Sequence, residues 1–260
     1  NDGHRDQEWD GGCEDPRIVE MEDGGYLMTY SAWNGRHCRL SIATSDDLVH
    51  WTKHGTAFGS VYDHLWSKSG SIVCRYEGER IIATKINGMY WMYWGESSIF
   101  LACSEDLIEW HILTSMHDEK KVSEFGDGSY HVHFEGGISG PRPVLKPGRG
   151  RFDSALVEPG PPAMLTDQGI LLLYNSANSD DPTRPVLSYA PGQALFDPRD
   201  PATVIGRCTE PFLTPNQPGE EIGQVNNVVF IEGLVKHQGR WLLYYGMADS
   251  LIGVASCPAD

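Results

Sequence analysis

Two short stretches of the chain, TSDDLVHW at residues 44–51 and CSEDLIEW at residues 103–110, repeat each other almost letter for letter. Each follows an apolar, strand-like run that ends in small residues, at Ala43 and Ala102. We interpret both as the turn that closes a repeated structural unit. Self-similarity at a long period is typical of solenoids and propellers, so the repeat decides the fold class.

Working outward from these turns, four stretches share one outline: an apolar strand, a turn with Gly, a Tyr-rich strand, and a last strand that ends in small residues. They cover residues 14–51, 70–110, 155–190 and 226–256. The ends of their last strands recur at intervals of 59, 88 and 65 residues, so the period is loose and carries insertions.

Short runs rich in Tyr, Trp, Val and Ile, punctuated by Gly and Asp, predict antiparallel sheet, and no helical periodicity of useful length occurs. Repeated four-stranded units predict an all-β fold, a β-propeller whose blades surround a central channel. A β-sandwich is the alternative. We expect residues 1–260 to form one catalytic propeller domain.

Residues 111–153 interrupt the repeat with a stretch rich in Gly, Pro and charge, which we predict to be a long inter-blade insertion. Within it, His131, His133 and Glu135 could form a metal pair on a small hairpin, but an exposed hairpin is the simpler interpretation. The six cysteines show no CxxC pair or zinc spacing. We therefore expect no metal and no cofactor.

The formal net charge of −16 argues against nucleic acid and anionic membrane as general partners. No apolar run is long enough for a transmembrane helix. The chain begins NDGHRDQEWD, with no initiator Met and no signal-peptide pattern, so we expect a fragment or a processed chain. Its compartment and oligomeric state are left open.

Four carboxylates lie at strand ends: Asp15 before a strand, Glu96 after the apolar run MYWMYWG, Glu158 before a Pro-rich bend, and Asp249 after LLYYGMA. In a propeller, equivalent strand ends of all blades converge on one mouth of the channel. Two carboxylates facing a concave site suit glycoside hydrolysis. The competing interpretation is that these acids simply face solvent or bond to loop amides.

Aromatic side chains could form platforms for sugar rings; the candidates are Trp33, Trp66, Trp91, Tyr93 and Trp94. Other candidate substrate-binding residues are Arg17, Asn34, Lys85, Asn175 and Trp94. For Arg17 and Lys85, ordinary ion pairing is the competing interpretation.

The motifs EDPRI, EPGPPA, GQALFDPRDPATVIGR, PFLTP and NNVVFIEGLV resemble glycoside hydrolase family 130. This family holds β-mannoside phosphorylases and β-1,2-mannosidases on a five-bladed β-propeller. The resemblance covers nearly the whole chain from Gly11 onward. It implies that about four blades are visible here and that much of the first blade precedes Asn1.

The resemblance implies that Asp15, in the EDPR motif, is the proton donor of the phosphorylases, acting through a sugar hydroxyl. It also implies that Glu158 and Asn175 stand where phosphorylases have a phosphate-binding lysine and histidine. A carboxylate beside a bound phosphate costs about 1–4 kcal/mol. The hydrolytic branch resembles this pattern, with glutamates at the positions of Glu96 and Glu158.

The sequence therefore predicts an inverting glycoside hydrolase that releases mannose from β-mannosides, with β-1,2 linkages preferred. Glu158 would activate water and Glu96 would act as the acid, with Asp15 and Asp249 holding mannose hydroxyls; the two glutamates can exchange roles. The alternatives are a phosphorylase that produces mannose 1-phosphate and an inactive sugar-binding propeller. The expected partner in each case is an oligosaccharide or mannoside.

Overall fold

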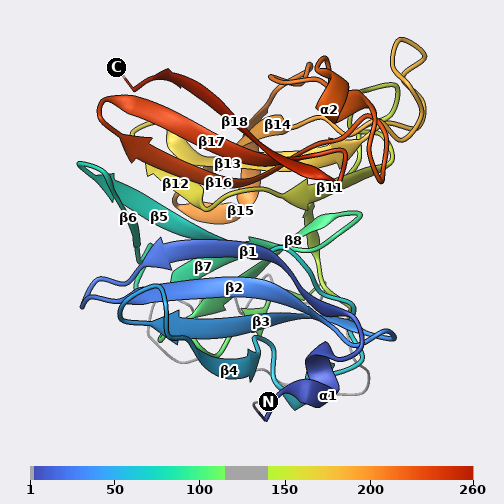
Figure 1. Cartoon of the computed structure of the whole chain (residues 1–260). Coiled ribbons are helices and arrows are strands. Elements are labelled where there is room, and N and C mark those ends of the chain that lie inside the picture. Colours follow the sequence, from blue (N-terminus) through green and yellow to red (C-terminus); the bar gives the residue numbers. More distant parts are fainter. Residues whose placement is uncertain (1–2, 115–139, 260) are drawn as a thin grey trace.

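The computed structural model describes residues 3–114 and 140–259 of the chain, and this part is all-β (Figure 1). Its helical segments are the short α1 (Arg5–Glu8), η1 (Ser60–Tyr62) and α2 (Pro218–Glu221). Its strands are β1 (Gly12–Glu20), β2 (Tyr26–Trp33), β3 (Cys38–Ser45), β4 (Thr52–Thr56), β5 (Ser71–Glu77), β6 (Arg80–Ala83), β7 (Tyr90–Trp94), β8 (Ile99–Ser104), β9 (His111–Ile112), β10 (Pro143–Leu145), β11 (Leu156–Pro159), β12 (Ala163–Thr166), β13 (Gly169–Ala177), β14 (Gly192–Asp197), β15 (Asp200–Arg207), β16 (Val229–His237), β17 (Arg240–Met247) and β18 (Leu251–Pro258).

The strands form four antiparallel groups that follow the four repeats of the sequence. The first is the meander β1–β2–β3–β4, and the second joins β5 to β6 and β7, with β8 paired to β7. In the third, β11 and β12 both pair with β13, which continues to β14 and β15. The fourth, β16–β17–β18, is a separate sheet. Short parallel pairings, β1 with β6 and β5 with β12, connect the first three groups.

The two repeated turns have the same hydrogen bonds, which explains why their sequences match. In the first, Ser45 Oγ accepts the amide of Leu48 at 2.9 Å, and the carboxylate of Asp47 accepts two further amides. Leu48 adopts a positive φ of 65°. The second turn uses Ser104, Asp106 and Leu107 in the same way, with φ 71° at Leu107. The two predicted turns therefore have the same structure.

Strand β7 is buried on both faces, because its alternating side chains enter two different hydrophobic clusters. Trp91 and Tyr93 pack into one cluster, and Met92 and Trp94 into the other. Trp94 is 0% exposed, between Phe58 at 4.6 Å and Phe100 at 5.0 Å between ring centroids. Burying such side chains contributes roughly 1.5–3 kcal/mol each. The apolar run that precedes Glu96 is thus a central core strand.

The ends of the predicted insertion belong to the sheet, since β9 and β10 both pair with β8. Residues 115–139, with His131, His133 and Glu135 of the weaker metal hypothesis, lie outside the described residues.

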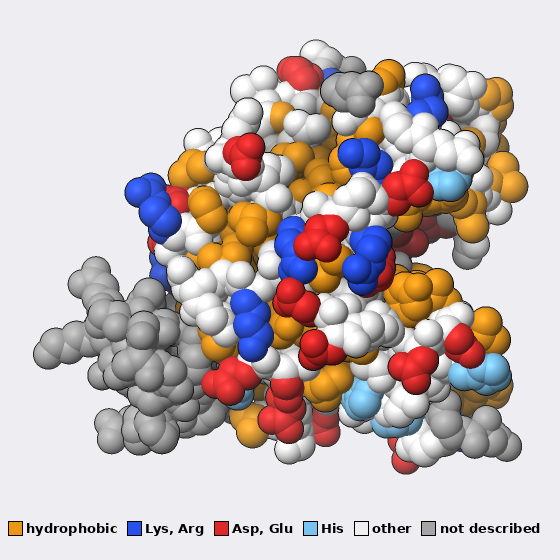
Figure 2. All heavy atoms as spheres, turned by 90° about the vertical axis from the view of Figure 1, so that its left-hand side faces the viewer, with side chains coloured by type: hydrophobic (Ala, Val, Ile, Leu, Met, Phe, Trp, Pro, Cys, Tyr) orange, Lys and Arg blue, Asp and Glu red, His pale blue; other side chains and the backbone are white. Residues whose placement is uncertain are grey.

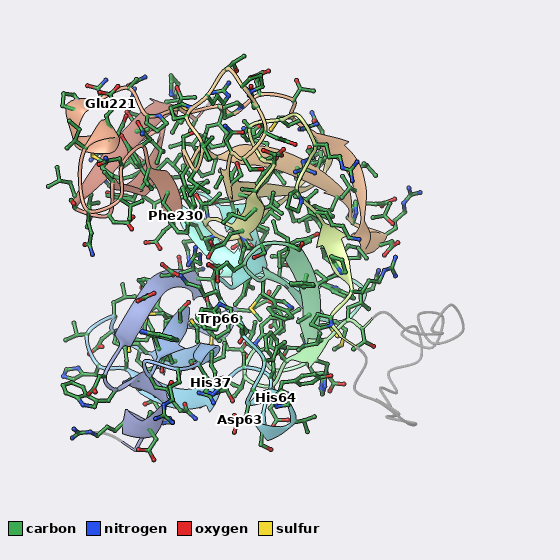
Figure 3. All side chains as sticks on the ribbon, turned by 90° about the vertical axis from the view of Figure 1, so that its right-hand side faces the viewer. His37, Asp63, His64, Trp66, Glu221 and Phe230 are labelled. Carbon is green, nitrogen blue, oxygen red and sulfur yellow. The ribbon has the colours of Figure 1, made fainter. Side chains whose placement is uncertain are left out.

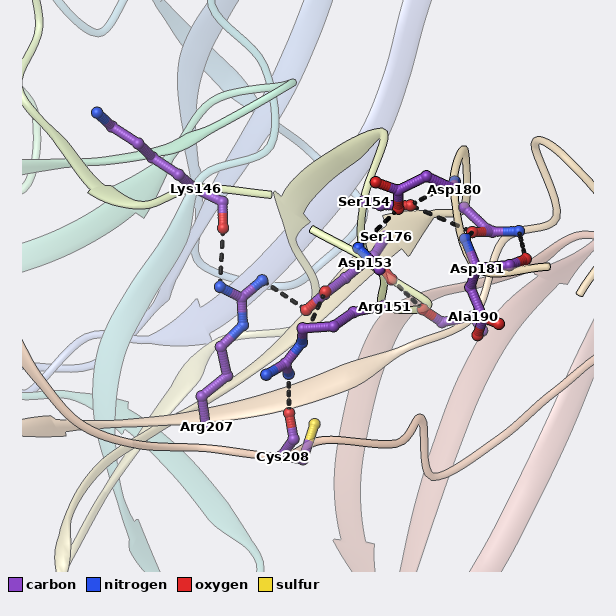
Figure 4. A network of polar contacts seen from close by, with 12 residues as sticks. Lys146, Arg151, Asp153, Ser154, Ser176, Asp180, Asp181, Ala190, Arg207 and Cys208 are labelled. Atoms are coloured by element: carbon purple, nitrogen blue, oxygen red, sulfur yellow. Dashed lines mark hydrogen bonds and ion pairs between the residues drawn. The ribbon is translucent and has the colours of Figure 1, made fainter. Parts of the chain in front are cut away.

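A buried ionic network fixes the chain between β10 and β11 (Figure 4). Asp153 is 0% exposed and accepts hydrogen bonds from Tyr174 Oη at 2.7 Å and Arg151 Nε at 3.2 Å. Arg207 also pairs with Asp153 and donates to the carbonyl oxygen of Lys146 at 2.8 Å. Because a buried carboxylate requires such partners, the network holds the residues that lead into β11 against β15.

One end of the strands is covered by paired charges (Figure 2). Acidic and basic side chains lie next to each other in the middle of this face. The ion pairs at these strand ends are Arg80–Glu20 at 2.6 Å, Arg75–Glu22 at 3.0 Å and Arg75–Glu77 at 2.9 Å, and His237 Nδ1 lies 3.2 Å from Glu79 Oε2. The opposite end of the strands carries the unbalanced carboxylates described next.

Candidate active site

A partly buried lysine, Lys68, is the centre of the candidate site, and no sequence pattern marked it. Lys68 Nζ lies 3.2 Å from Asp15 Oδ2 and 3.7 Å from Glu14 Oε2, with the Lys68 side chain 19% exposed. Burial lowers the pKa of Lys68, but the charges of Asp15, Glu158 and Glu96 outweigh burial and raise it. The three predicted catalytic carboxylates therefore surround one ammonium group.

Glu96 is held at the turn between β7 and β8. Gly95 precedes it with φ 118°, and a Cβ there would lie 2.6 Å from the carbonyl oxygen of Ser98, so only glycine fits. The amide of Gly95 donates to the carbonyl oxygen of Lys68 at 2.8 Å. Glu96 Oε2 accepts a hydrogen bond from Trp66 Nε1 at 2.7 Å. Glu96 is thus a partly buried carboxylate fixed beside Lys68.

Glu158 lies on β11 and is 3% exposed. Its Oε1 accepts a short hydrogen bond from the hydroxyl of Ser69, the residue after Lys68. Burial raises the pKa of Glu158 to about 7, the Lys68 charge opposes this rise, and the Asp15 charge adds to it. The amide of Val157 donates to the carbonyl oxygen of Ser97 at 3.4 Å, so the residues next to Glu158 and Glu96 are bonded to each other.

Asp15 lies in an irregular part of β1, where the pairing register shifts between Glu14 and Arg17 and Asp15 has φ 53°. Burial acts to raise its pKa, but Arg17 and Lys68 outweigh burial and lower it. A β-bulge of this kind redirects a side chain, and here it directs the Asp15 carboxylate towards Lys68.

Arg17 has a structural role in place of the predicted contact with substrate. It is 2% exposed, and Nε and Nη2 donate to the carbonyl oxygens of Gly160 at 2.8 Å and Pro159 at 3.0 Å. Nη1 donates to the carbonyl oxygen of Asp15 at 2.6 Å. Arg17 therefore ties the Asp15 segment to the bend that follows Glu158.

Glu232 is a second site residue that the sequence analysis missed. It lies on β16, where the pairing register shifts between Ile231 and Gly233. Its Oε1 is 3.9 Å from Arg17 Nη1, and its side chain is 30% exposed. The same Arg17 Nη1 donates to the carbonyl oxygen of Asp15, so Glu232 and Asp15 are neighbours and each affects the pKa of the other. The signal in the sequence was a single carboxylate inside the apolar run VVFIEGLV.

Asn175 lies opposite Glu158 in the sheet but is fully buried. Its Nδ2 donates to the carbonyl oxygen of Ile231 at 2.9 Å, and its Oδ1 accepts the Ile231 amide at 2.7 Å. Asn175 thus braces the strand next to Glu232, and its amide group is used within the protein.

Three other predicted substrate-binding residues are not brought to the carboxylates. Trp94 is wholly inside the core and offers no face to a sugar. Lys85 stacks on Tyr90, 4.9 Å from the ring centroid, at the end of β7 remote from Glu96. Asn34 Oδ1 accepts a hydrogen bond from the His37 amide at 2.9 Å, which stabilises the turn after β2.

Asp249 is exposed in the turn between β17 and β18, with φ 51°. Its charge acts on Tyr189, as do the charges of Glu158, Glu96 and Lys68, so Asp249 lies on the same side of the molecule as the site. Burial and these carboxylates raise the pKa of Tyr189.

Two aromatic pairs border the carboxylates. Trp33 and Trp66 are 5.4 Å apart and Tyr189 and Phe230 are 6.2 Å apart, between ring centroids. Figure 3 looks onto this end of the molecule, with the four strand groups around a common middle and Trp66 and Phe230 close to it. Trp66 is 48% exposed, so its ring is available to a ligand. Of the aromatic residues proposed from the sequence, Trp33 and Trp66 fit the platform, whereas Trp91 and Tyr93 belong to the core.

Within the described residues, no group of three or more His, Cys, Asp or Glu side chains is arranged to hold a metal ion. The same part of the chain has no helix long and apolar enough to span a membrane.

Comparison with known proteins identifies the family. The model of the Glyco_hydro_130 family, described as beta-1,4-mannooligosaccharide phosphorylase, matches residues 4–260. The chain belongs to glycoside hydrolase family 130. The predicted family is therefore confirmed.

The relatives of this family 130 chain include enzymes with two kinds of name. A 1,2-beta-oligomannan phosphorylase of Thermoanaerobacter sp. is 32% identical, over 94% of this chain and 67% of the relative. The structure of a glycosyl hydrolase from Bacteroides ovatus is 42% identical with a TM-score of 0.87, covering 100% of this chain and 70% of the other. The same values hold for a structure described as "The GH130 family of mannoside phosphorylases contains glycoside hydrolases that target beta-1,2 mannosidic linkages in Candida mannan". The chain thus spans about two thirds of the length of these relatives.

Proposed function

We propose that this family 130 protein is a glycoside hydrolase that releases mannose from β-1,2-linked mannosides by an inverting mechanism. The observation that carries the proposal is the balance of charge in the site. Asp15, Glu96, Glu158 and Glu232 face the two cations Lys68 and Arg17.

Both of these cations already have partners within the protein. The Arg17 guanidinium donates to three backbone carbonyl oxygens, and the Lys68 ammonium is paired with Asp15 and Glu14. A phosphate bound beside Glu158 would be repelled by about 1–4 kcal/mol. A neutral water molecule has no such cost, and buried carboxylates can accept its hydrogens.

In this proposal Glu158 is the general base. Its burial raises its pKa to about 7, and a base whose pKa is near the working pH is the most effective. Glu96 orients the same water, because the residues next to it and to Glu158 are joined by a backbone hydrogen bond. Asp15 then lies on the leaving-group side and supplies the proton through a sugar hydroxyl.

This assignment revises the role predicted for Glu96. In an inverting enzyme the acid and the base flank the scissile bond from opposite faces, about 6.5–9.5 Å apart. Glu96 and Glu158 lie on chain segments that are hydrogen-bonded to each other, so both are expected on the same face of the sugar and not on opposite faces. Asp249 and the Trp33–Trp66 pair remain our candidates for mannose contacts.

We further propose that the complete protein is a five-bladed β-propeller, with the four strand groups as blades and the active site at the end seen in Figure 3. The arrangement of the groups around a common middle and the strong similarity to family 130 structures support this proposal.

A phosphorylase is the second candidate, because the family model and the 32% identical relative carry that name. The discriminating experiment incubates the full-length protein with β-1,2-mannobiose, with and without inorganic phosphate. We expect mannose as the product in both cases and no mannose 1-phosphate. Turnover that requires phosphate would overturn the hydrolase, and loss of all activity in Glu158→Gln, with Glu79→Gln as the active control, would support the site.

A further inference from the structure

The carboxylate of Glu232 is held in place by three separate features of the fold. It lies at the register shift of β16, so its side chain leaves the regular alternation of the strand. Asn175 fixes the backbone of the preceding Ile231 through both its amide atoms. Arg17 Nη1 is 3.9 Å from Glu232 Oε1 and also donates to the carbonyl oxygen of Asp15. This degree of support exceeds what a solvent-facing glutamate requires.

The neighbour of Glu232 is a second carboxyl group, Asp15. Arg17 Nη1 donates to the carbonyl oxygen of Asp15 and lies 3.9 Å from Glu232 Oε1, so one guanidinium group holds both residues. Two carboxylates brought together in this way repel each other unless one of them carries a proton. From this geometry we infer that Glu232 and Asp15 share one proton, and that Glu232 holds the proton that Asp15 delivers to the leaving group. Glu232 is thus a positioning residue that acts through Asp15, and this inference rests on the proposed function.

The surrounding charges favour this distribution of the proton. Burial raises the pKa of Glu232 to about 7; the charges of Arg17 and Lys68 oppose the rise, and Asp15 adds to it. For Asp15, burial is outweighed by Arg17, Lys68 and the hydrogen bond from Glu232, which lower its pKa.

The groups that face the pair come from three directions. Arg17 is on β1, Lys68 precedes β5, and the uncharged Ser31 on β2 donates its hydroxyl to Asp15 Oδ2 at 3.4 Å. The pair therefore carries one proton, on Glu232, at pH values below about 7 and loses it as the pH rises through about 7.

The reaction balances with this single stored proton. Glu232 transfers its proton to Asp15, Asp15 passes that same proton to a sugar hydroxyl, and the hydroxyl passes its own proton to the glycosidic oxygen as the C1–O bond breaks. Water attacks C1, and its proton goes to Glu158. Glu158 then releases a proton to solvent and the Asp15–Glu232 pair takes one up, which restores the starting state.

The test is the variant Glu232→Gln in the full-length protein. Glutamine can still donate a hydrogen bond to Asp15, but it cannot hold a transferable proton. We expect kcat/KM for β-1,2-mannobiose at pH 7.5 to fall about 100-fold, the usual size of a general-acid effect, and the alkaline limb of the pH profile to move to lower pH. A dinitrophenyl β-mannoside, whose leaving group needs no proton, should lose less than about threefold.

The matched control is Glu79→Gln, which removes another carboxylate bound to the β16–β17 hairpin, at the opposite strand end, where Glu79 accepts the Gln238 amide. It should retain the wild-type pH profile with both substrates. Equal losses of Glu232→Gln on both substrates, or an unmoved alkaline limb, would refute the shared proton and leave Glu232 a structural residue.

Phosphorolysis also needs a protonated leaving group, so the Glu232→Gln effect on the pH profile tests the shared proton whether the acceptor is water or phosphate. The identity of the acceptor, in contrast, tests the proposed hydrolase function. The pH profile is therefore measured with water and with phosphate as acceptor. Carboxyl carbon NMR gives a readout without turnover: two glutamates should titrate near pH 7 in the wild type and only Glu158 in Glu232→Gln. A wild-type Glu232 that titrates near 4.5 would overturn the inference.

Discussion

Replacing Lys68 by methionine removes the positive charge at the centre of the site while keeping a side chain of similar length. The Lys68 ammonium lies 3.2 Å from Asp15 Oδ2 and also acts on Glu158 and Glu96. It lowers the pKa of Glu158 and of Glu232, against the effect of burial. Loss of the charge must therefore raise the pKa of both glutamates above about 7.

The size of the change can be estimated from Coulomb's law for two charges in neighbouring side chains. Two unit charges about 5 Å apart interact by roughly 1–2 kcal/mol at an effective dielectric between that of water and that of a protein surface. One pKa unit corresponds to about 1.4 kcal/mol, so we expect shifts of about one unit. As the proposed general base, Glu158 is active only when ionised, and the proposed Asp15–Glu232 pair is active only when protonated. Both limbs of the pH profile should thus move about one unit towards alkaline pH.

The assay is kcat/KM for β-1,2-mannobiose from pH 5 to pH 10. At pH 6, Lys68→Met should retain about one tenth of the wild-type value, and at alkaline pH the loss should be smaller. Lys85→Met is the matched control, because Lys85 is exposed at the remote end of β7, and it should leave the profile unchanged. A uniform loss at every pH, or a shift towards acid pH, would refute the electrostatic reasoning.

Two further predictions concern Arg17 and Trp66. Arg17→Met leaves three carbonyl oxygens without their donor and should lower the free energy of unfolding, measured in urea, by about 3–5 kcal/mol. The control Arg199→Met, at an exposed ion pair, should change this free energy by less than about 1 kcal/mol. Similar values for the two variants would contradict the bracing role of Arg17. Trp66→Phe keeps an aromatic ring but removes the hydrogen bond to Glu96, so its kcat should fall about tenfold. The control Trp33→Phe should keep a kcat near that of the wild type, and equal losses in the two variants would show that only ring stacking matters.

The repeated units could be predicted from the sequence because their signals are local. The two matching turns depend on a serine, an aspartate and a leucine within four residues, and the strands between them have β-forming composition. The candidate carboxylates Asp15, Glu96 and Glu158 could be proposed for a related reason, since each interrupts an apolar or Pro-rich segment at a strand end.

The residues that were misjudged depend on contacts between distant parts of the chain. Arg17 and Asn175 were assigned to substrate, yet their partners lie 143 and 56 residues away, and only the fold reveals them. Trp94 was assigned to a sugar platform because alternation cannot distinguish a strand with one buried face from a strand with two. Lys68 lies in an irregular segment outside the repeats, so no pattern marked it.

Turnover of β-1,2-mannobiose in H₂¹⁸O with excess inorganic phosphate shows whether the site activates water or phosphate. Mass spectrometry locates the label and proton NMR identifies the first anomer released from the non-reducing end. We predict mannose that carries ¹⁸O at C1 and appears first as the α-anomer, the product of inversion at a β-linkage. Unlabelled mannose 1-phosphate as the main product would contradict hydrolysis, and ¹⁸O-labelled mannose released first as the β-anomer would contradict the inverting arrangement of Glu158 and Asp15.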